Sequence, residues 1–342
     1  WNIDFPHLML RAKAVRFRQG KVRSRDRILA STDAVGKLAS IPIVTQVVNA
    51  TNKSKTGRKL LDKVLGVHPE AILPEYHGRT LRKRIGGGTG AAETAEPAGP
   101  TSGKVVLFAT CYGNYNEPGI NEDLVAIMQH NKIPVTLAHK EQCCGMPLLE
   151  LGDLDAVKAA RDANIPQLLA LVDDGWDIVA PIPSCVLMFK QELPLMFPED
   201  DAVACVRDAI YDPFEYLMLR HKHGKLNTNF SESLGTIAYH VACHLRVQNI
   251  GMKTRDVLQL VPDTTIEPIE RCSGHDGTYA VKREFHETSM KICRPVVNQV
   301  IRSGVSHYRS DCPMAGHQIE NGLENKVAPV HPLTLLRRAY GI

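Results

Sequence analysis

The sequence predicts an α/β protein in which two similar repeats follow a basic helical arm. Short apolar segments of strand length alternate with amphipathic segments of helix length along residues 104–342. Cysteines follow these segments at intervals of 32 and 42 residues in the first half and 29 and 40 in the second: Cys111, Cys143 and Cys185, then Cys243, Cys272 and Cys312. This recurrence indicates an internal duplication, so we expect two repeats related by a pseudo-twofold axis.

Residues 1–85 predict a helical arm and not a separate domain. Helix-length apolar patterns cover residues 8–17, 34–50 and 57–65, the second interrupted by a proline. Residues 1–103 hold 18 Lys and Arg against 8 Asp and Glu, a charge of +10, which leaves −6 for the rest of a chain of net charge +4. Because unpaired charges are costly to bury, most of these basic side chains should lie in solvent, where they favour an acidic partner or an anionic membrane.

A Gly- and Pro-rich stretch, residues 86–103, predicts a linker between the arm and the repeats, because it holds no residue able to anchor a core. The first repeat is expected at residues 104–235 and the second at residues 236–342. In the first, we expect strands at 104–110, 134–138 and 176–180 and helices at 121–130 and 155–173. In the second, we expect strands at 235–242 and 304–311 that lead into Cys243 and Cys312.

Composition and short motifs exclude several classes of function. The chain is 44% hydrophobic and 23% charged, which is typical of a globular protein, and no stretch approaches the roughly 18 to 20 apolar residues of a membrane-spanning helix. The arm lacks zinc-finger and RNA-binding patterns, so no nucleic-acid partner is expected. Dinucleotide, phosphate-loop and hydrolase motifs are absent as well.

The start of the chain indicates a cytoplasmic protein. No secretory leader precedes the arm, and because the chain opens with Trp1 and not Met, we expect its gene to encode further residues. The basic arm leaves a second location open, peripheral on the inner face of the cytoplasmic membrane.

The cysteines are the residues of this sequence that indicate a chemical function. Nine are present, and seven of them follow strands instead of lying within apolar runs. A disulfide framework is not expected, because the number of cysteines is odd, the chain is large, and no secretory leader is recognised in it. Thiolates that converge from three segments bind a soft metal or an iron–sulfur cluster. The other two, Cys205 and Cys293, lie in helical context and are expected to be small buried hydrophobes.

The residues around the cysteines resemble a known family. The matching segments are Cys111, Cys143-Cys144-Gly145-Met146-Pro147, Cys185, Cys243-His244-Leu245, Cys272-Ser273-Gly274 and Asp311-Cys312-Pro313, together with residues 141–155, 277–279 and 331–336. They are similar to the duplicated cysteine-rich (CCG) domain of the heterodisulfide reductases. They resemble more closely the iron–sulfur subunits of anaerobic glycerol-3-phosphate dehydrogenase and of glycolate oxidase. The resemblance covers residues 104–342, and the arm looks like the segment that follows a ferredoxin module in such proteins.

The resemblance implies an iron–sulfur electron-transfer subunit. Its partners would be a flavin-dependent dehydrogenase and a ferredoxin-type module, and its electron acceptor a quinone or another carrier. The family's ferredoxin-like module, with two Cys-x-x-Cys-x-x-Cys runs, is absent from these 342 residues, so we expect it on residues before Trp1 or on another chain. No catalytic residue is identified, so an oxidoreductase subunit is favoured over a stand-alone enzyme.

The sequence departs from the family pattern at the ligand positions. Met188 and Ala315 stand where the last cysteine of each repeat is expected, so five-thiolate, non-cubane ligation is in doubt in both. In the second repeat, Ser273 also replaces the second cysteine of the pair.

The ligand set that the resemblance implies therefore differs between the repeats. In the first, four thiolates suffice for one [4Fe–4S] cluster or for tetrahedral zinc: Cys111, Cys143, Cys144 and Cys185. In the second, three thiolates remain, with Ser273, His244 or His275 as a further ligand: Cys243, Cys272 and Cys312. One or two clusters are expected, since the second repeat has either kept a cluster with an open iron or lost it.

Two other functions are open at this point. One is thiol or disulfide reduction at an incompletely ligated cluster, as in heterodisulfide reductases, which Ala315 disfavours. The other is a structural subunit that binds zinc or no metal.

Overall fold

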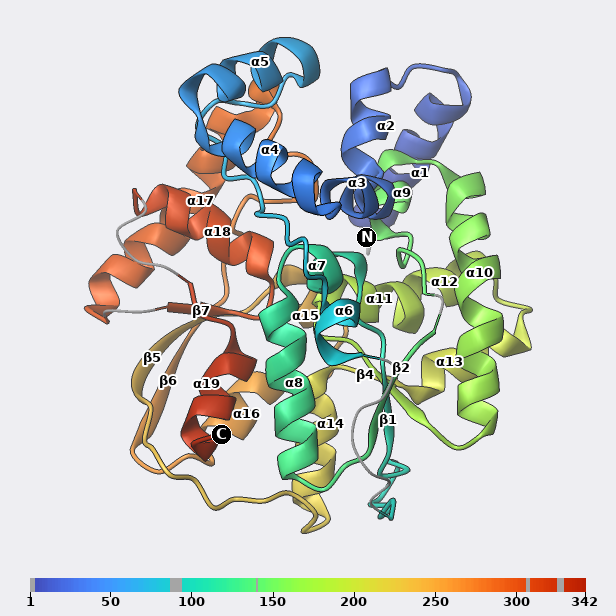
Figure 1. Ribbon diagram of the computed structural model, residues 1–342, viewed down its shortest axis with the longest axis vertical. Helices are drawn as coiled ribbons and strands as arrows, with labels where there is room; N and C mark the ends of the chain where they lie inside the picture. The colour runs from blue at the N-terminus through green and yellow to red at the C-terminus, as the bar shows by residue number, and fades with distance from the viewer. Residues whose placement is uncertain (1–3, 87–93, 140, 306–307, 325–328) are drawn as a thin grey trace.

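Each repeat is built on a parallel β-sheet with helices packed against it; in Figure 1, β1 and β2 of the first sheet lie right of centre, and β5 and β6 of the second lie at the left. The structure is a computed structural model that describes residues 4–86, 94–139, 141–305, 308–324 and 329–342. Its mixed α/β architecture confirms the predicted fold class. None of the helices in these ranges combines the length and the apolar character that a membrane span needs.

The first sheet has the strand order β2-β1-β3-β4. Its strands are β1 (Val105–Leu107), β2 (Val135–Leu137), β3 (Asp177–Val179) and β4 (Ile210–Tyr211). In register, Val105 lies opposite Val135 on one side and Asp177 on the other. All three residues of β1 are buried, as expected for a central parallel strand covered on both faces.

The second sheet repeats this arrangement with the order β6-β5-β7. Its strands are β5 (Gly235–His240), β6 (Thr264–Ile269) and β7 (Tyr308–Ser310). In both sheets the first strand along the chain is central and the next two flank it, which is the duplication that the cysteine intervals predict. Strand β4 has no counterpart in the described part of the second repeat.

Helices fill the connections between strands. In the first repeat they are α7 (Cys111–Tyr115), α8 (Pro118–His130), α9 (Met146–Leu151), α10 (Leu154–Asp173), α11 (Pro183–Leu187), the π-helix η1 (Met188–Glu192), α12 (Leu193–Met196), α13 (Asp201–Ala209) and α14 (Pro213–Lys222). In the second they are α15 (Cys243–Arg246), α16 (Lys253–Leu258), α17 (Arg283–Ser303), α18 (Pro313–Gly322) and α19 (Pro332–Tyr340). Prolines begin several of them, because a proline in the first turn has no N–H to leave unpaired and its fixed φ suits a helix.

The two repeats share one apolar core. Leu107 of β1 and Tyr239 of β5 belong to the same cluster of buried side chains, and α8 contacts α19 while α14 contacts α16. Burying one such side chain stabilises the fold by roughly 1.5–3 kcal/mol. The shared core therefore fixes the position of one sheet relative to the other.

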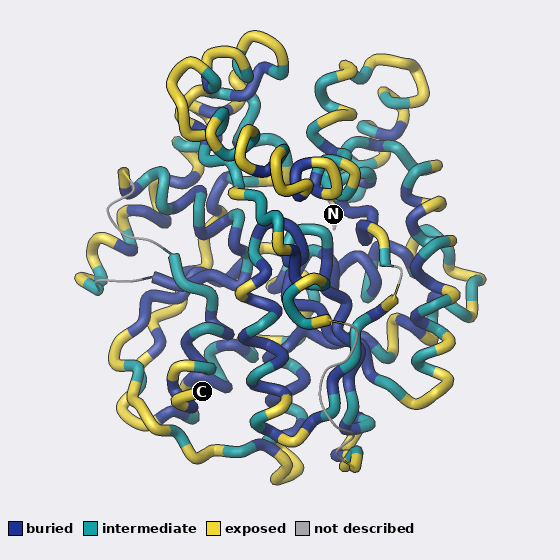
Figure 2. Tube along the Cα trace, viewed as in Figure 1, coloured by how far each residue is buried: buried dark blue, intermediate teal, exposed yellow. Residues whose placement is uncertain are grey.

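The arm is helical, as predicted; its first five helices lie at the top of Figure 1 against both repeats, and its last helix lies near the centre beside α8. Its helices are α1 (Phe5–Arg18), α2 (Ser24–Ala30), α3 (Thr32–Ala39), α4 (Pro42–Lys53), α5 (Lys55–Leu65) and α6 (Leu81–Ile85). Helices α1 and α2 contact α9, and α3 contacts α7. Figure 2 shows that much of the arm's outer surface is exposed.

Part of the predicted linker is packed and does not form a free tether. Residues 87–93 lie outside the described residues, but Thr101 is only 1% exposed. Ala98 and Thr101 exchange two backbone hydrogen bonds, and the buried Arg220 of α14 donates a 2.7 Å hydrogen bond to the carbonyl of Glu96. The expectation that nothing in this stretch anchors a core is wrong for residues 94–103, because backbone carbonyls and small side chains pack around this arginine.

Candidate metal centres at the strand ends

The cysteines of the first repeat follow the carboxyl ends of three neighbouring parallel strands. Cys111 begins α7 after β1, Cys143 and Cys144 precede α9 after β2, and Cys185 lies in α11 after β3. Parallel strands bring these ends to one edge of the sheet. Thr110 has a positive φ of 64° there, a rare conformation for a β-branched residue, and its hydroxyl accepts a 2.9 Å hydrogen bond from the Gly113 N–H.

The structure brings the four predicted thiols of the first repeat together. The sulfurs of Cys111 and Cys143 lie 4.0 Å apart, and the Cys144 thiol contacts those of Cys143 and Cys185. Three of the four residues are buried, and Cys111 is half-buried. Four sulfurs from three chain segments therefore form one group, which we call the first cysteine site.

The thiols of the first cysteine site differ in acidity. Hydrogen bonds from the neighbouring Cys111 and Cys144 thiols lower the pKa of Cys143 well below its ordinary value. The same contacts, with burial, raise the pKa of Cys111 and of Cys144. One thiolate is thus favoured and further thiolates are disfavoured unless a cation compensates their charge. Metal binding supplies that cation and releases the protons.

The donor set of the first cysteine site suits two kinds of metal group. The Cys111 and Cys143 sulfurs lie 4.0 Å apart, and Zn–S bonds of about 2.3 Å place the sulfurs of a tetrahedral zinc site about 3.8 Å apart. Four thiols from three chain segments are also the ligand set of an iron–sulfur cluster. The residues of this site therefore fit either group.

The arm contacts the first cysteine site through Thr32 and the loop before it through Arg82, and neither contact is visible in the sequence. The Thr32 hydroxyl at the start of α3 lies 3.4 Å from the Cys111 sulfur and 3.7 Å from the Cys143 sulfur. Arg82 of α6 forms a 3.0 Å ion pair with Glu141, whose other oxygen accepts from the Ala109 N–H. Burial raises the pKa of Glu141 to about 7. Both contacts span tens of residues, so no local pattern signals them.

Met188 occupies space beside the first cysteine site. It is fully buried at the start of η1, and its terminal methyl carbon lies 3.4 Å from where a Cβ on Gly145 would be. In the sequence, this methionine stands at the position where the family pattern has a fifth cysteine, and in the structure its thioether packs beside the other four. The first repeat therefore offers four cysteine thiols.

The second repeat places its three cysteines at the equivalent strand ends. Cys243 begins α15 after β5, Cys272 follows β6, and Cys312 caps the N-terminus of α18 after β7. Cys243 and Cys272 are exposed, and Cys312 is half-buried. These three residues form the second cysteine site, which is more open than the first.

The thiols of the second cysteine site also differ in acidity. A hydrogen bond from the Cys243 thiol lowers the pKa of Cys272 to about 6, and the Gly274 N–H donates to the same sulfur at 3.3 Å. The same hydrogen bond between the two thiols, together with burial, raises the pKa of Cys243. Burial raises the pKa of Cys312 to about 11.

The polar residues near the second cysteine site fall into two groups. His240 is a structural residue, because its ring lies 3.0 Å from the Ser310 hydroxyl and 2.9 Å from the Arg271 carbonyl. Ser273 is buried and His244 half-buried, so both remain candidate ligands. The Nε2 atom of His275 is buried without a hydrogen-bond partner, and burial lowers the pKa of that imidazole to about 4.

The two cysteine sites are neighbours. Helix α11, which holds Cys185, contacts α15, which begins with Cys243. The Gln248 side chain donates a 3.2 Å hydrogen bond to the Pro183 carbonyl across this contact. Figure 1 shows α7, α11 and α15 together beneath α3.

The two remaining cysteines have different surroundings. Cys293 is fully buried in α17, as predicted. Cys205 is exposed on α13, so its predicted burial is wrong. The reason is helical phase: Val203 and Val206 face the core, and position 205 between them points away from it.

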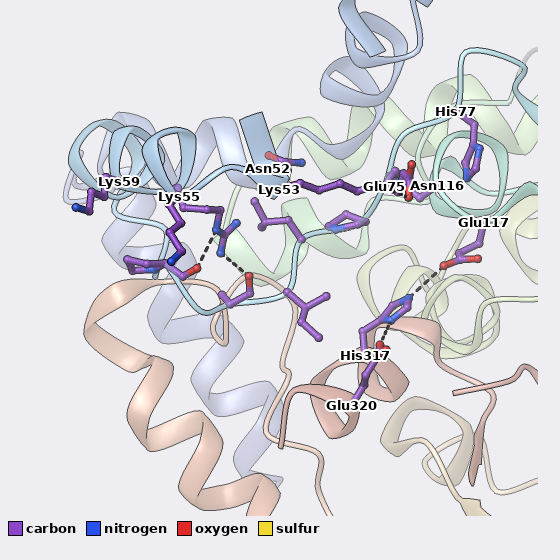
Figure 3. A pocket seen from close by; sticks show the side chains of 16 residues that line it. Asn52, Lys53, Lys55, Lys59, Glu75, His77, Asn116, Glu117, His317 and Glu320 are labelled. Atoms are coloured by element: carbon purple, nitrogen blue, oxygen red, sulfur yellow. Dashed lines mark hydrogen bonds and ion pairs between the residues drawn. The ribbon is translucent and has the colours of Figure 1, made fainter. Parts of the chain in front are cut away.

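A cavity of about 840 Å³ lies between the arm and the two repeats (Figure 3). Lysines of α4 and α5, including Lys55 and Lys59, line one end, and His317 of α18 lines the other. The His317 ring lies 3.2 Å from Glu117 and 2.9 Å from Glu320. Although burial opposes it, these two carboxylates raise the pKa of His317. No cysteine lines this cavity.

Comparison with known proteins identifies both repeats. Residues 105–190 and residues 237–320 each match the family described as a cysteine-rich domain, CCG. The C subunit of anaerobic glycerol-3-phosphate dehydrogenase from Escherichia coli K12 is 28% identical over 317 residues, which cover 92% of this chain and 77% of that protein. Lactate utilization protein A of Bacillus pumilus is 27% identical over 190 residues, 52% of this chain and 75% of that protein. The protein of that name from Bacillus cereus G9842 is 25% identical over 219 residues, 61% of this chain and 87% of that protein.

Proposed function

Because the chain carries two copies of the cysteine-rich CCG domain, we propose that it is an iron–sulfur electron-transfer subunit of a dehydrogenase complex. The observation that carries this proposal is the convergence of four cysteine thiols, from three strand ends, at a largely buried site. A cluster bound there supplies one-electron redox chemistry. The similarity to a protein that is named as one subunit of a dehydrogenase supports a redox partner subunit.

The residues of this chain suit a relay. Burial of the first cysteine site keeps water from its thiols, and the Thr32 hydroxyl supplies a hydrogen-bond donor at two sulfurs. The contact between α11 and α15 places the second cysteine site next to the first. Electrons from a flavin-dependent dehydrogenase or a ferredoxin-type module would pass through this pair of sites to a quinone or another carrier.

Metal analysis of anaerobically purified protein tests the cofactor. One [4Fe–4S] cluster in the first repeat predicts about four iron and four sulfide per chain, lost in Cys143→Ser and kept in the matched control Cys205→Ser, whose thiol lies on the outer face of α13. About eight of each would assign a second cluster to the second repeat, with Cys243, Cys272 and Cys312 and with Ser273 or His244 as ligands. Zinc without sulfide would contradict the relay and favour a structural metal subunit.

A second candidate function is thiol–disulfide chemistry in the second repeat. It is favoured by the exposed pair Cys243 and Cys272, which are hydrogen-bonded to each other while one of them has a pKa of about 6. In exchange with a substrate disulfide, the Cys272 thiolate would attack one substrate sulfur and release the other as a thiolate, which takes the proton of the Cys243 thiol. The Cys243 thiolate would then displace the remaining substrate sulfur, so that the substrate disulfide accepts the two electrons released when the Cys243–Cys272 disulfide forms. Mass spectrometry after mild oxidation should then detect this bond, and retention of iron by the second cysteine site under the same conditions would argue against it.

The outer face of the arm is the surface that we assign to docking. Ile43 and Val47 on α4 are 77% and 61% exposed, and Leu60 and Val64 on α5 are 57% and 65% exposed, among the basic residues of an arm with a charge of +10. Exposed apolar side chains among basic ones suit an acidic partner or an anionic membrane at the cytoplasmic face.

Sedimentation with vesicles distinguishes the two targets to which the arm could dock, an anionic membrane and an acidic partner subunit. If the membrane is the target, the protein should bind phosphatidylglycerol vesicles at low salt but not neutral ones, and the double variant Ile43→Glu, Val47→Glu should stay in solution with its iron content unchanged. If wild type and the double variant are recovered equally from the supernatant, the membrane is not the target, and the acidic partner subunit is the target that the arm binds.

A further inference from the structure

A group of potential metal ligands lies where the arm meets the second repeat. The ligand atoms of His68, Glu70 and His286 all lie within 4.8 Å of one another. His68 and Glu70 belong to the loop after α5, and His286 belongs to the first turns of α17. Nothing in the proposed electron relay uses these three residues.

Backbone pairing holds the two sides of this group together. Val67 forms an antiparallel bridge with Lys282. The His68 N–H donates to the Val281 carbonyl at 2.8 Å, and the Arg283 N–H donates to the Gly66 carbonyl at 2.8 Å. The loop and the start of α17 are therefore in fixed register, which makes the ligand positions a property of the fold.

His286 is oriented as metal-binding histidines are. It is 4% exposed, and its Nδ1 atom lies 2.8 Å from the Ala280 carbonyl oxygen. Because a carbonyl can only accept, Nδ1 carries the proton and Nε2 keeps its lone pair. A hydrogen bond from the second ring nitrogen to a backbone carbonyl is the usual way in which proteins fix such a ligand.

His68 is the ligand that must move. Its ring stacks on that of His286 with centroids 4.0 Å apart and planes 17° from parallel, so their in-plane lone pairs do not meet at one point. Its Nδ1 atom accepts a 3.2 Å hydrogen bond from the Glu70 N–H. Rotation about the bond between Cβ and the ring, a torsion with a broad energy profile, would direct a nitrogen of this half-buried ring to a shared ion.

The surrounding charges favour a cation. Glu70 is exposed and close enough to ligate, and Asp62 and Glu287 act on His68 electrostatically as well. The nearby cations are engaged: Arg283 pairs with Asp62 at 2.9 Å, and Arg58 donates to the carbonyls of His68 and Pro69.

We propose that His68, Glu70 and His286 bind one divalent transition-metal ion of the zinc type through two nitrogens and one oxygen, and that this ion fastens the arm to the second repeat. Two imidazoles and a carboxylate form a donor set that zinc accepts, with water in the fourth position. The same loop continues into the wall of the cavity in Figure 3 through Pro69 and Ala71. The ion would therefore also fix one wall of that cavity.

The experiment is zinc titration of the full-length protein with its iron and sulfide content measured before and after. We expect wild type to take up one zinc per chain without loss of iron. His68→Gln should bind zinc at least about tenfold more weakly, as when one contributor to a metal site is removed. The control is His223→Gln, because His223 is an exposed histidine at the end of α14.

Two further readouts keep the test decisive. Cobalt in place of zinc should give visible absorption bands without sulfur-to-metal charge transfer, because the donors are nitrogen and oxygen. Zinc should raise the thermal midpoint of wild type and of His223→Gln but not of His68→Gln, because an ion that binds only the folded chain stabilises it. The proposal is overturned if wild type takes up no zinc, if His68→Gln binds it equally well, or if uptake is lost in Cys272→Ser instead.

Discussion

Thr32 brings the arm into contact with the sulfurs of the first repeat. Its hydroxyl lies within 3.7 Å of two cysteine sulfurs, and it stands at the first position of α3, a helix that contacts α7. Hydrogen bonds to cluster sulfurs raise reduction potentials, because they stabilise the more negative, reduced state. The arm therefore contributes a side chain to the first cysteine site.

Replacing Thr32 by valine should lower the reduction potential of a cluster in the first cysteine site by tens of millivolts. Valine keeps the shape of threonine but removes the donor, and a hydrogen bond to a charged group contributes about 1.5–3 kcal/mol, of which only the difference between the two oxidation states moves the potential. A redox titration followed by EPR measures this shift. Thr32→Ser keeps the hydroxyl and should restore the wild-type value; a potential that is identical in the valine variant would contradict the contact.

At the residue scale, the sequence predicts which side chains could bind a metal better than it predicts which side chains lie around them. The four thiols of the first repeat could be chosen because cysteine at strand ends is chemically unusual, and the structure brings them together. Thr32 and Arg82 could not be chosen, because their contacts depend on how the arm folds back over 79 and 59 residues. The exposure of Cys205 depends on the rotation of α13 about its own axis, which two flanking valines define only once the core is known.

At the scale of elements, the sequence predicts the strands that contain an apolar run or that precede a cysteine in the repeated order, and it misses the others. Strands β1, β2 and β3 fall within the segments expected from apolar runs, and β5 and β7 fall within those expected before Cys243 and Cys312. Strand β6 contains Pro268 and buries only Ile266 and Ile269, which suits an edge strand, and β4 has only two residues. Neither provides the local pattern that separates a strand from a loop.

The close approach of α1 to α9 depends on a glycine. Gly152 has a φ of +88°, and a Cβ there would lie 2.6 Å from the backbone carbonyl carbon of Lys13. Both the left-handed backbone and the contact exclude a side chain. The ion pair between Lys13 and Glu150, at 2.6 Å, lies at the same junction.

Gly152→Ala should therefore lower the free energy of unfolding by about 1–3 kcal/mol and loosen α1. Thermal denaturation measures the first effect, and limited proteolysis of the turn between α1 and α2 measures the second. Gly119→Ala is the matched control, since Gly119 lies in the first turn of α8 with no atom near its Cβ position. Alanine there should leave stability unchanged or raise it; equal behaviour of the two variants would show that α1 does not depend on this contact.

At the scale of the whole molecule, the shared core gives the two cysteine sites a common frame. Residues of β1 and β5 pack in one cluster, so disturbance of the second repeat is felt at the contact between α11 and α15. The duplication was visible in the cysteine intervals, but the fusion of the cores was not, because it depends on how α8 meets α19 and α14 meets α16. Stability of the second sheet therefore also maintains the contact between the two cysteine sites.

Three buried histidines of the second repeat should make the protein less stable in acid, because burial lowers the pKa of His275 and of His331, like that of His240, to about 4. Of these, His240 links β5 to β7 through its contact with the Ser310 hydroxyl. Burial lowers the pKa of this imidazole from 6.5 to about 4. Above pH 6.5 the residue is neutral in both states and its contribution is fully present; as the pH falls from about 6.5 towards 4, the unfolded chain gains a proton that the folded chain does not accept, and stability is lost. At pH 5 this loss is about 2 kcal/mol, or several degrees in the thermal midpoint.

His240→Asn removes the titrating group, so it should be less stable than wild type at pH 7 but lose less stability between pH 7 and pH 5. Asparagine can still donate to the Arg271 carbonyl, the partner of the imidazole Nε2 atom, which limits the cost at neutral pH. Thermal midpoints at both pH values, with iron content measured at each, give the comparison, and His223→Gln should show the wild-type slope because that histidine is exposed. If the asparagine variant and wild type lose the same number of degrees, the acid sensitivity arises elsewhere in the protein.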